Sequence, residues 1–129
     1  MELEGLAAAL AAERATGEDR AELLRLLDDL ERSERADHTE LDAQVHRAIY
    51  ASARNEFLEA TLHHYANLAL RIWNFCLREN LAVDRAIHSQ HEVVEAIVRG
   101  DASAARAAAE QHLRGFSDEV RSTLLATRA

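Results

Sequence analysis

Residues 41–55, LDAQVHRAIYASARN, hold the two features from which the rest of the fold can be worked out. Val45 and Ile49 are four residues apart, the spacing of an apolar face on an α-helix. Asp42 and His46 have the same spacing and fall on the side that such a helix buries. Burying a carboxylate and an imidazole is unfavourable unless a partner satisfies them, and a shared metal ion can satisfy both. This stretch therefore predicts a polar site inside a helical bundle.

The rest of the 129-residue chain has the composition of an almost wholly helical protein. It contains no proline and only four glycines, and long runs are rich in Ala, Leu, Glu and Arg. No run of Val, Ile, Thr and aromatic residues alternates at the period of two that indicates a strand. The alanine-rich segment 101–113 is expected to be a helix that its neighbours approach closely. We expect one all-α domain spanning residues 1–129.

Charge and apolar content exclude two classes of partner. The chain has 23 acidic and 15 basic residues and a formal net charge of -8, which argues against direct binding to a phosphate backbone. No segment resembles a signal peptide, and none approaches the roughly 20 apolar residues of a membrane span. The single cysteine, Cys76, cannot form an internal disulfide and is interpreted as a core residue. We expect a soluble cytoplasmic protein with no membrane partner.

Capping and turn residues divide the chain into six predicted helices. Gly17 is predicted to end the first helix with a left-handed residue, and Asp101 to cap the last one after Gly100. The segment from Ala36 to Thr39 is predicted to break the chain, with Thr39 as a helix cap. Short connections favour antiparallel neighbours. The helices are expected at residues 2–14, 18–35, 40–55, 56–78, 82–99 and 102–127.

Helical periodicity predicts that two further helices contribute inward polar residues. On the last helix, His112 shares a face with Ala105 and other apolar residues. On the fifth helix, Gln90 shares the inward face with Val94, and His91 flanks it. The polar residues expected to point inward are Asp42, His46 and His112, with Gln90 as a fourth.

Imidazole and carboxylate groups from separate helices suit a divalent transition metal, and zinc, nickel, iron and manganese all fit. The alternative is that each polar group hydrogen-bonds to its neighbours in a dry core. The remaining histidines are interpreted mainly as surface or loop residues: His38, His63, His64, His88 and His91.

Three segments that together cover most of the chain match a known pattern. Residues 3–19, LEGLAAALAAERATGED, are similar to its opening segment. Residues 41–58 carry its D-x-x-x-H helix, followed by small residues and Asn. Residues 93–113, VVEAIVRGDASAARAAAEQHL, are similar to its closing helix pair with a Gly-Asp junction. The chain thus resembles the FCD domain, the C-terminal effector-binding domain of FadR-type regulators in the GntR family of transcription factors.

The resemblance implies a bundle of six or seven antiparallel helices, usually dimeric, around a central cavity for a small effector, often a carboxylic acid. It also implies a metal at the cavity floor, held by one Asp and three His. Asp42, His46 and His112 match three of these positions. The fourth position holds Gln90, and an amide is a much poorer ligand than imidazole. His91, one residue later, is the alternative ligand, and a one-residue bulge would turn it inward.

Full-length regulators of this type carry a winged helix-turn-helix domain ahead of the FCD domain. DNA would be contacted only through that domain, which we do not find in this chain, so an excised or a stand-alone effector domain is expected. The candidate effector-binding residues are Arg71, whose planar fork matches a carboxylate, and Asn55. The alternative for Arg71 is a surface arginine.

The expected function is therefore effector sensing by a homodimeric regulator, without enzymatic activity. A di-iron enzyme would need paired Glu-x-x-His motifs, which the sequence lacks. A hydrolase would need an acid or base beside the metal, and Asp42 already serves as a ligand. The alternatives are another metal-dependent enzyme built in a helical bundle and a metal-free dimerisation module.

Overall fold

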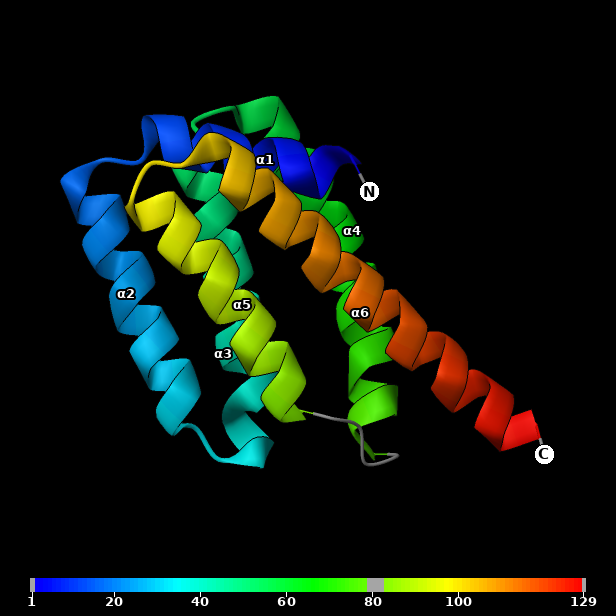
Figure 1. The fold of residues 1–129 in the computed structure, drawn as a ribbon. Helices are drawn as coiled ribbons and strands as arrows, with labels where there is room; N and C mark the ends of the chain where they lie inside the picture. The colour runs from blue at the N-terminus through cyan, green and yellow to red at the C-terminus, as the bar shows by residue number, and fades with distance from the viewer. Residues whose placement is uncertain (1, 79–82, 129) are drawn as a thin grey trace.

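The structure, a computed structural model, describes residues 2–78 and 83–128, apart from some of their side chains (Figure 1). All regular elements in this part of the chain are helical, which confirms the predicted all-α class. The elements are α1 (Glu2–Arg14), α2 (Gly17–Arg32), α3 (Arg35–Ser52), α4 (Glu56–Arg78), α5 (Val83–Val98) and α6 (Ala102–Arg128).

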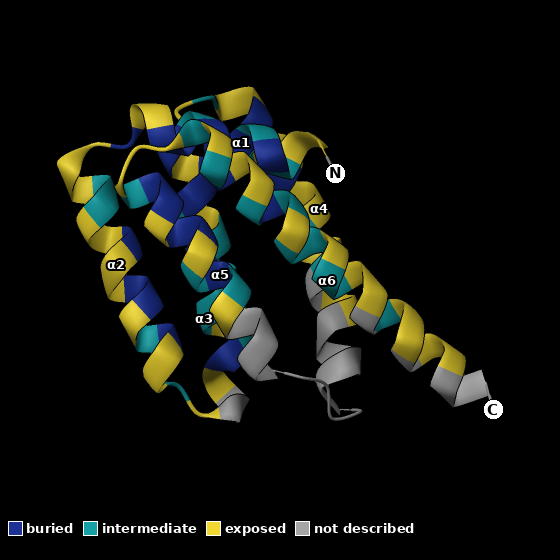
Figure 2. Cartoon of the chain, in the orientation of Figure 1, coloured by how far each residue is buried: buried dark blue, intermediate teal, exposed yellow. Residues whose placement is uncertain are grey.

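The helices form a bundle with α1 across one end, where α5 finishes and α6 begins (Figure 1). α1 packs mainly against α6, and α5 lies between α6 and α2. α3 contacts α1, α2 and α4, so it is surrounded on three sides. The buried residues line the inner sides of these helices (Figure 2). Whatever polar groups α3 turns inward must therefore find their partners inside the bundle.

Small residues permit the close packing of α1 on α6. Six residues of α1, all alanine or glycine, are buried. A Cβ added to Gly5 would lie 3.0 Å from Glu110 Oε1 and 3.2 Å from Arg106 Cγ, both in α6. The expected close approach to the alanine-rich segment is therefore found, and Ala105 and Ala109 of α6 are buried in it.

Two predicted helix ends are confirmed in position but one differs in chemistry. Thr16 caps α2 through a capping box, because its Oγ1 accepts from Asp19 N and its own N donates to Asp19 Oδ2. Gly17 is thus the first residue of α2 and not a left-handed cap. Gly100 does take the left-handed conformation, with φ of 76°, and Asp101 Oδ1 accepts from Ala104 N at the start of α6.

The predicted break between the second and third helices is wrong. α2 ends at Arg32, and α3 already begins at Arg35, so residues 36–39 are helical and Thr39 is not a cap. Ser33 ends α2 instead, since its Oγ donates to Leu30 O at 2.6 Å. The N-cap position of α3 is Glu34, which makes no side-chain capping bond. His38, in the first turns of α3, is buried. Packing against the rest of the bundle therefore stabilises the start of this helix, although the local sequence offers no capping residue there.

No helix in the described residues is long and apolar enough to cross a membrane. The side chain of Cys76, for which a core position was predicted, lies outside the part of the chain that the structure describes.

Candidate metal centre

The inner side of α3 carries four ring or carboxylate side chains at successive helical turns. They are His38, Asp42, His46 and Tyr50. His38 and Tyr50 are buried, and Val45 and Ile49 beside them are core residues, as their spacing predicts. His38 was interpreted as a surface or loop residue, which is wrong: only 1 % of it is exposed. Its spacing of four from Asp42 was the available signal, but the helix break predicted at residues 36–39 concealed it.

Asp42 and His46 of α3 meet His112 of α6 inside the bundle. One candidate ligand atom from each of the three residues lies within 4.8 Å of the other two. His46 Nε2 is 3.4 Å from Asp42 Oδ2, and the ring centroids of His46 and His112 are 5.5 Å apart. Ligand atoms around a tetrahedral zinc ion lie roughly 3.4 Å from one another. The three residues therefore have the spacing and the donor types of a transition-metal site.

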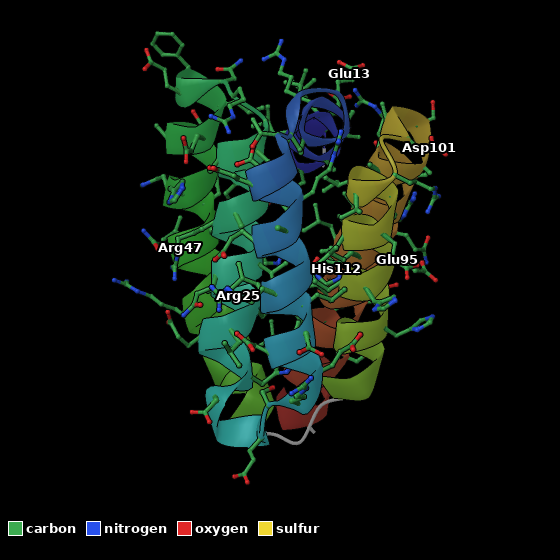
Figure 3. All side chains as sticks on the ribbon, turned by 90° about the vertical axis from the view of Figure 1, so that its left-hand side faces the viewer. Glu13, Arg25, Arg47, Glu95, Asp101 and His112 are labelled. Atoms are coloured by element: carbon green, nitrogen blue, oxygen red, sulfur yellow. The ribbon has the colours of Figure 1, made fainter. Side chains whose placement is uncertain are left out.

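The cluster is enclosed but not sealed. The side chains of His46 and Asp42 are 19 % and 17 % exposed, respectively. In the view of Figure 3, His112 is seen between the ribbons of α2 and α5. The candidate ligands are therefore largely, but not completely, shielded from water.

Gln90 faces the cluster from α5, as its helical register predicts. Gln90 is 1 % exposed, and its Nε2 donates to Asp42 Oδ1 across 3.2 Å. His91 lies apart, with Nδ1 2.6 Å from Glu31 of α2 and Nε2 2.8 Å from Glu95. α5 is a continuous α-helix, so the bulge that would turn His91 inward is not present in it. Gln90, and not His91, is therefore directed at Asp42 from α5.

Burial and mutual charge set the protonation of the cluster. Burial alone would raise the pKa of Asp42, but the charge and hydrogen bond of His46, with the charges of His112 and His38, hold that pKa below its ordinary value. Burial lowers the pKa of His46, yet Asp42 and Glu4 outweigh it and raise that pKa to about 9. Burial and the charge of His46 lower the pKa of His112 to about 4. At neutral pH the metal-free cluster thus contains a carboxylate, an imidazolium and a neutral imidazole.

The two candidate effector-binding residues lie on or next to α4. Asn55 Oδ1 accepts from Phe57 N and Leu58 N, each at 3.1 Å, so this side chain caps α4. Arg71 is exposed, in agreement with the surface interpretation. Contact of either residue with an effector stays a prediction.

Of the other histidines, His64 and His88 are exposed, as predicted. His63 is half-buried, and its ring packs edge-on against Tyr50 with centroids 5.8 Å apart.

Comparison with protein families identifies one domain over most of the chain. A family model described as the FCD domain matches residues 1–115. The chain belongs to the FCD domain family. The matched region includes α1 to α5 and the first half of α6. It contains Asp42, His46 and His112, together with Gln90. Comparison with curated proteins found no match. Membership of the FCD domain family assigns the chain to the effector-binding domains of GntR-type regulators, a regulatory class.

Proposed function

We propose that this FCD domain senses a small metabolite for a GntR-type transcription regulator through a divalent transition metal held by Asp42, His46 and His112. The observation that carries the proposal is the meeting of these three ligand types, from two helices, within 4.8 Å. Zinc, nickel, iron and manganese all accept this donor set. Three protein ligands leave coordination positions open, and a carboxylate group of the effector is suited to occupy them in a central cavity.

The contact between Gln90 and Asp42 supports a site with three protein ligands. An ionised carboxylate only accepts hydrogen bonds, so the amide nitrogen of Gln90 must be the atom that faces Asp42 Oδ1. That nitrogen has no lone pair to offer a metal. Gln90 is therefore proposed to orient Asp42, and the position that a histidine fills in the family pattern is left for the effector.

Arg71 and Asn55 are retained as proposed effector contacts. The guanidinium of Arg71 would bind a second carboxylate of the effector as a paired hydrogen-bond donor. Binding acts by differential affinity: the effector favours one arrangement of the helices and so one spacing of the DNA-binding domains in a homodimer. DNA is contacted only through those additional domains.

The proposal is tested by elemental analysis of the purified protein and by its melting temperature before and after a strong chelator. Near-stoichiometric metal is expected, and chelation should lower the melting temperature because a ligand bound only to the folded state stabilises it. Small dicarboxylates and hydroxy acids should then raise the melting temperature of the metal-bound form only.

His46→Ala should abolish metal retention, whereas His88→Ala is the matched control, since His88 is exposed on α5. Absence of metal together with no response to chelator would show that the domain acts without a metal. Metal binding without any response to carboxylates would contradict the proposed effector class alone.

A further inference from the structure

Each residue of the cluster has, on one side, a polar neighbour other than the three proposed metal ligands. Gln90 donates to Asp42 Oδ1, while Asp42 Oδ2 faces His46. Ser89 Oγ contacts Nδ1 of His112, which leaves Nε2 of that ring for a metal. The same arrangement recurs at His46, and there it extends to another helix.

His46 has a different neighbour at each ring nitrogen. Its Nε2 is the atom 3.4 Å from Asp42 Oδ2, and its Nδ1 is 3.5 Å from the hydroxyl oxygen of Tyr50. The Tyr50 hydroxyl donates in turn to Glu4 Oε1 of α1 at 2.6 Å. A line of polar contacts therefore runs from the cluster, through the buried Tyr50, to the first helix.

The donors and acceptors along this line of contacts can be assigned from hydrogen-bond chemistry. A carboxylate only accepts, so the single hydroxyl proton of Tyr50 is used on Glu4. The Tyr50 oxygen keeps lone pairs with which it can accept from His46. If a metal binds Nε2, the proton of the neutral ring must lie on Nδ1, where Tyr50 is the acceptor. The 3.5 Å contact is long for a hydrogen bond, and a proton on Nδ1 supplies the attraction that shortens it.

We propose that Tyr50, oriented by Glu4, is a positioning residue that holds His46 with Nε2 turned toward the metal. This inference rests on the proposed function, because it requires a metal in the cluster. It makes α1, through Glu4, part of the support of the metal centre. A merely structural role, in which Tyr50 only fills the core and ties α3 to α1, predicts a loss of stability without a specific loss of metal affinity.

The test is metal affinity, measured by competition with a chromophoric chelator, in Tyr50→Phe, Glu4→Ala and Glu4→Gln. Tyr65→Phe is the control, because Tyr65 is the other tyrosine of the chain and is exposed on α4. Tyr50→Phe should lower affinity for zinc about 10- to 100-fold, the usual effect of removing such a partner. Glu4→Ala should lower it by less, and Glu4→Gln by least, because the amide oxygen still accepts from Tyr50.

The absorption spectrum of the Co²⁺-substituted protein is the second readout. Tyr50→Phe should change the bands of the cobalt centre, since the imidazole ligand is no longer held in one orientation, while Tyr65→Phe should leave them unchanged. The Glu4 variants test the inference without altering the residue in contact with His46.

Three outcomes separate the two proposals. The first outcome is that the wild type binds metal and Tyr50→Phe changes neither the zinc affinity nor the cobalt spectrum. This result would overturn the inference about Tyr50 and leave the proposed function standing. The second outcome is that the metal-free variants melt at lower temperature while their zinc affinity stays constant. This result would assign Tyr50 a structural role only. A wild type that binds no zinc or cobalt would overturn both proposals.

Discussion

Asp42 and His46 show how far two residues can be interpreted without tertiary structure. Their spacing of four predicted that they share the buried side of a helix, and both lie beside His112 in the structure. Their charge states depend on that neighbourhood. The same burial that lowers the pKa of His112 is outweighed at His46 by Asp42, so two buried imidazoles differ in pKa by several units.

Metal binding is expected to release about one proton at pH 7. In the metal-free protein His46 is protonated at this pH, because its pKa is raised to about 9, and it must lose that proton to bind a metal. His112, with its pKa lowered to about 4, is already neutral, and Asp42 is already ionised. Affinity should therefore decrease as pH falls below about 9 and, below about 4, fall further as His112 becomes protonated.

Isothermal titration calorimetry with zinc in buffers of different ionisation enthalpy measures the protons released. His46→Gln should bind zinc more weakly and release none at pH 7, which isolates the contribution of this residue. Release of no protons by the wild type would show that His46 is neutral in the metal-free protein.

At the scale of the helices, the capping signals predicted where helices end better than they predicted which residue forms the cap. The end of α1 and the α5–α6 junction were placed correctly by Gly17 and Gly100, although Thr16 and Asp19 form the capping box. The start of α3 was misplaced because Glu34 makes no side-chain cap. No local signal marks this end, and the burial of His38 supports it.

Three glycines of this fold should respond differently to replacement by alanine. Gly115→Ala in α6 should stabilise the protein by about 0.5–1 kcal/mol, because its Cβ would meet nothing within 4 Å and alanine favours helix. Gly100→Ala should destabilise it by roughly 1–2 kcal/mol, since φ is 76° there. Gly5→Ala should gain less than Gly115→Ala, because its Cβ would press on Arg106 and Glu110.

Urea unfolding of the three variants measures these differences in the free energy of unfolding. Equal effects at Gly5 and Gly115 would mean that α1 and α6 are not as closely packed as described. A stabilising Gly100→Ala would contradict the left-handed end of α5.

At the scale of the whole molecule, α4 presents an apolar stripe to solvent. Phe57, Tyr65, Leu68 and Ile72 fall on one face of the helix, and Phe57 is 79 % exposed. Leu58 and Leu62, on the adjoining side of α4, are buried in the core. Exposed apolar stripes of this kind are typical of association surfaces.

We expect this stripe to contribute to the proposed homodimer. Leu68→Glu and Ile72→Glu should shift the protein toward monomer in sedimentation velocity, because each places a charge on the stripe. Leu24→Glu is the matched control, since Leu24 is similarly exposed but lies on α2. Metal content should be equal in all three variants. A monomeric wild type, or a dimer unaffected by both α4 variants, would contradict this assignment.

The sequence by itself determined the helical class, five of the six helix starts to within a residue, and the inward register of Asp42, Gln90 and His112, because periodicity and composition are local properties. Only the tertiary structure decided which inward residues meet. The hydrogen bond of Tyr50 to Glu4 joins residues 46 positions apart, and that of Gln90 to Asp42 joins residues 48 apart. Such contacts depend on how helices cross, and the spacing of residues within one helix carries no information about that crossing.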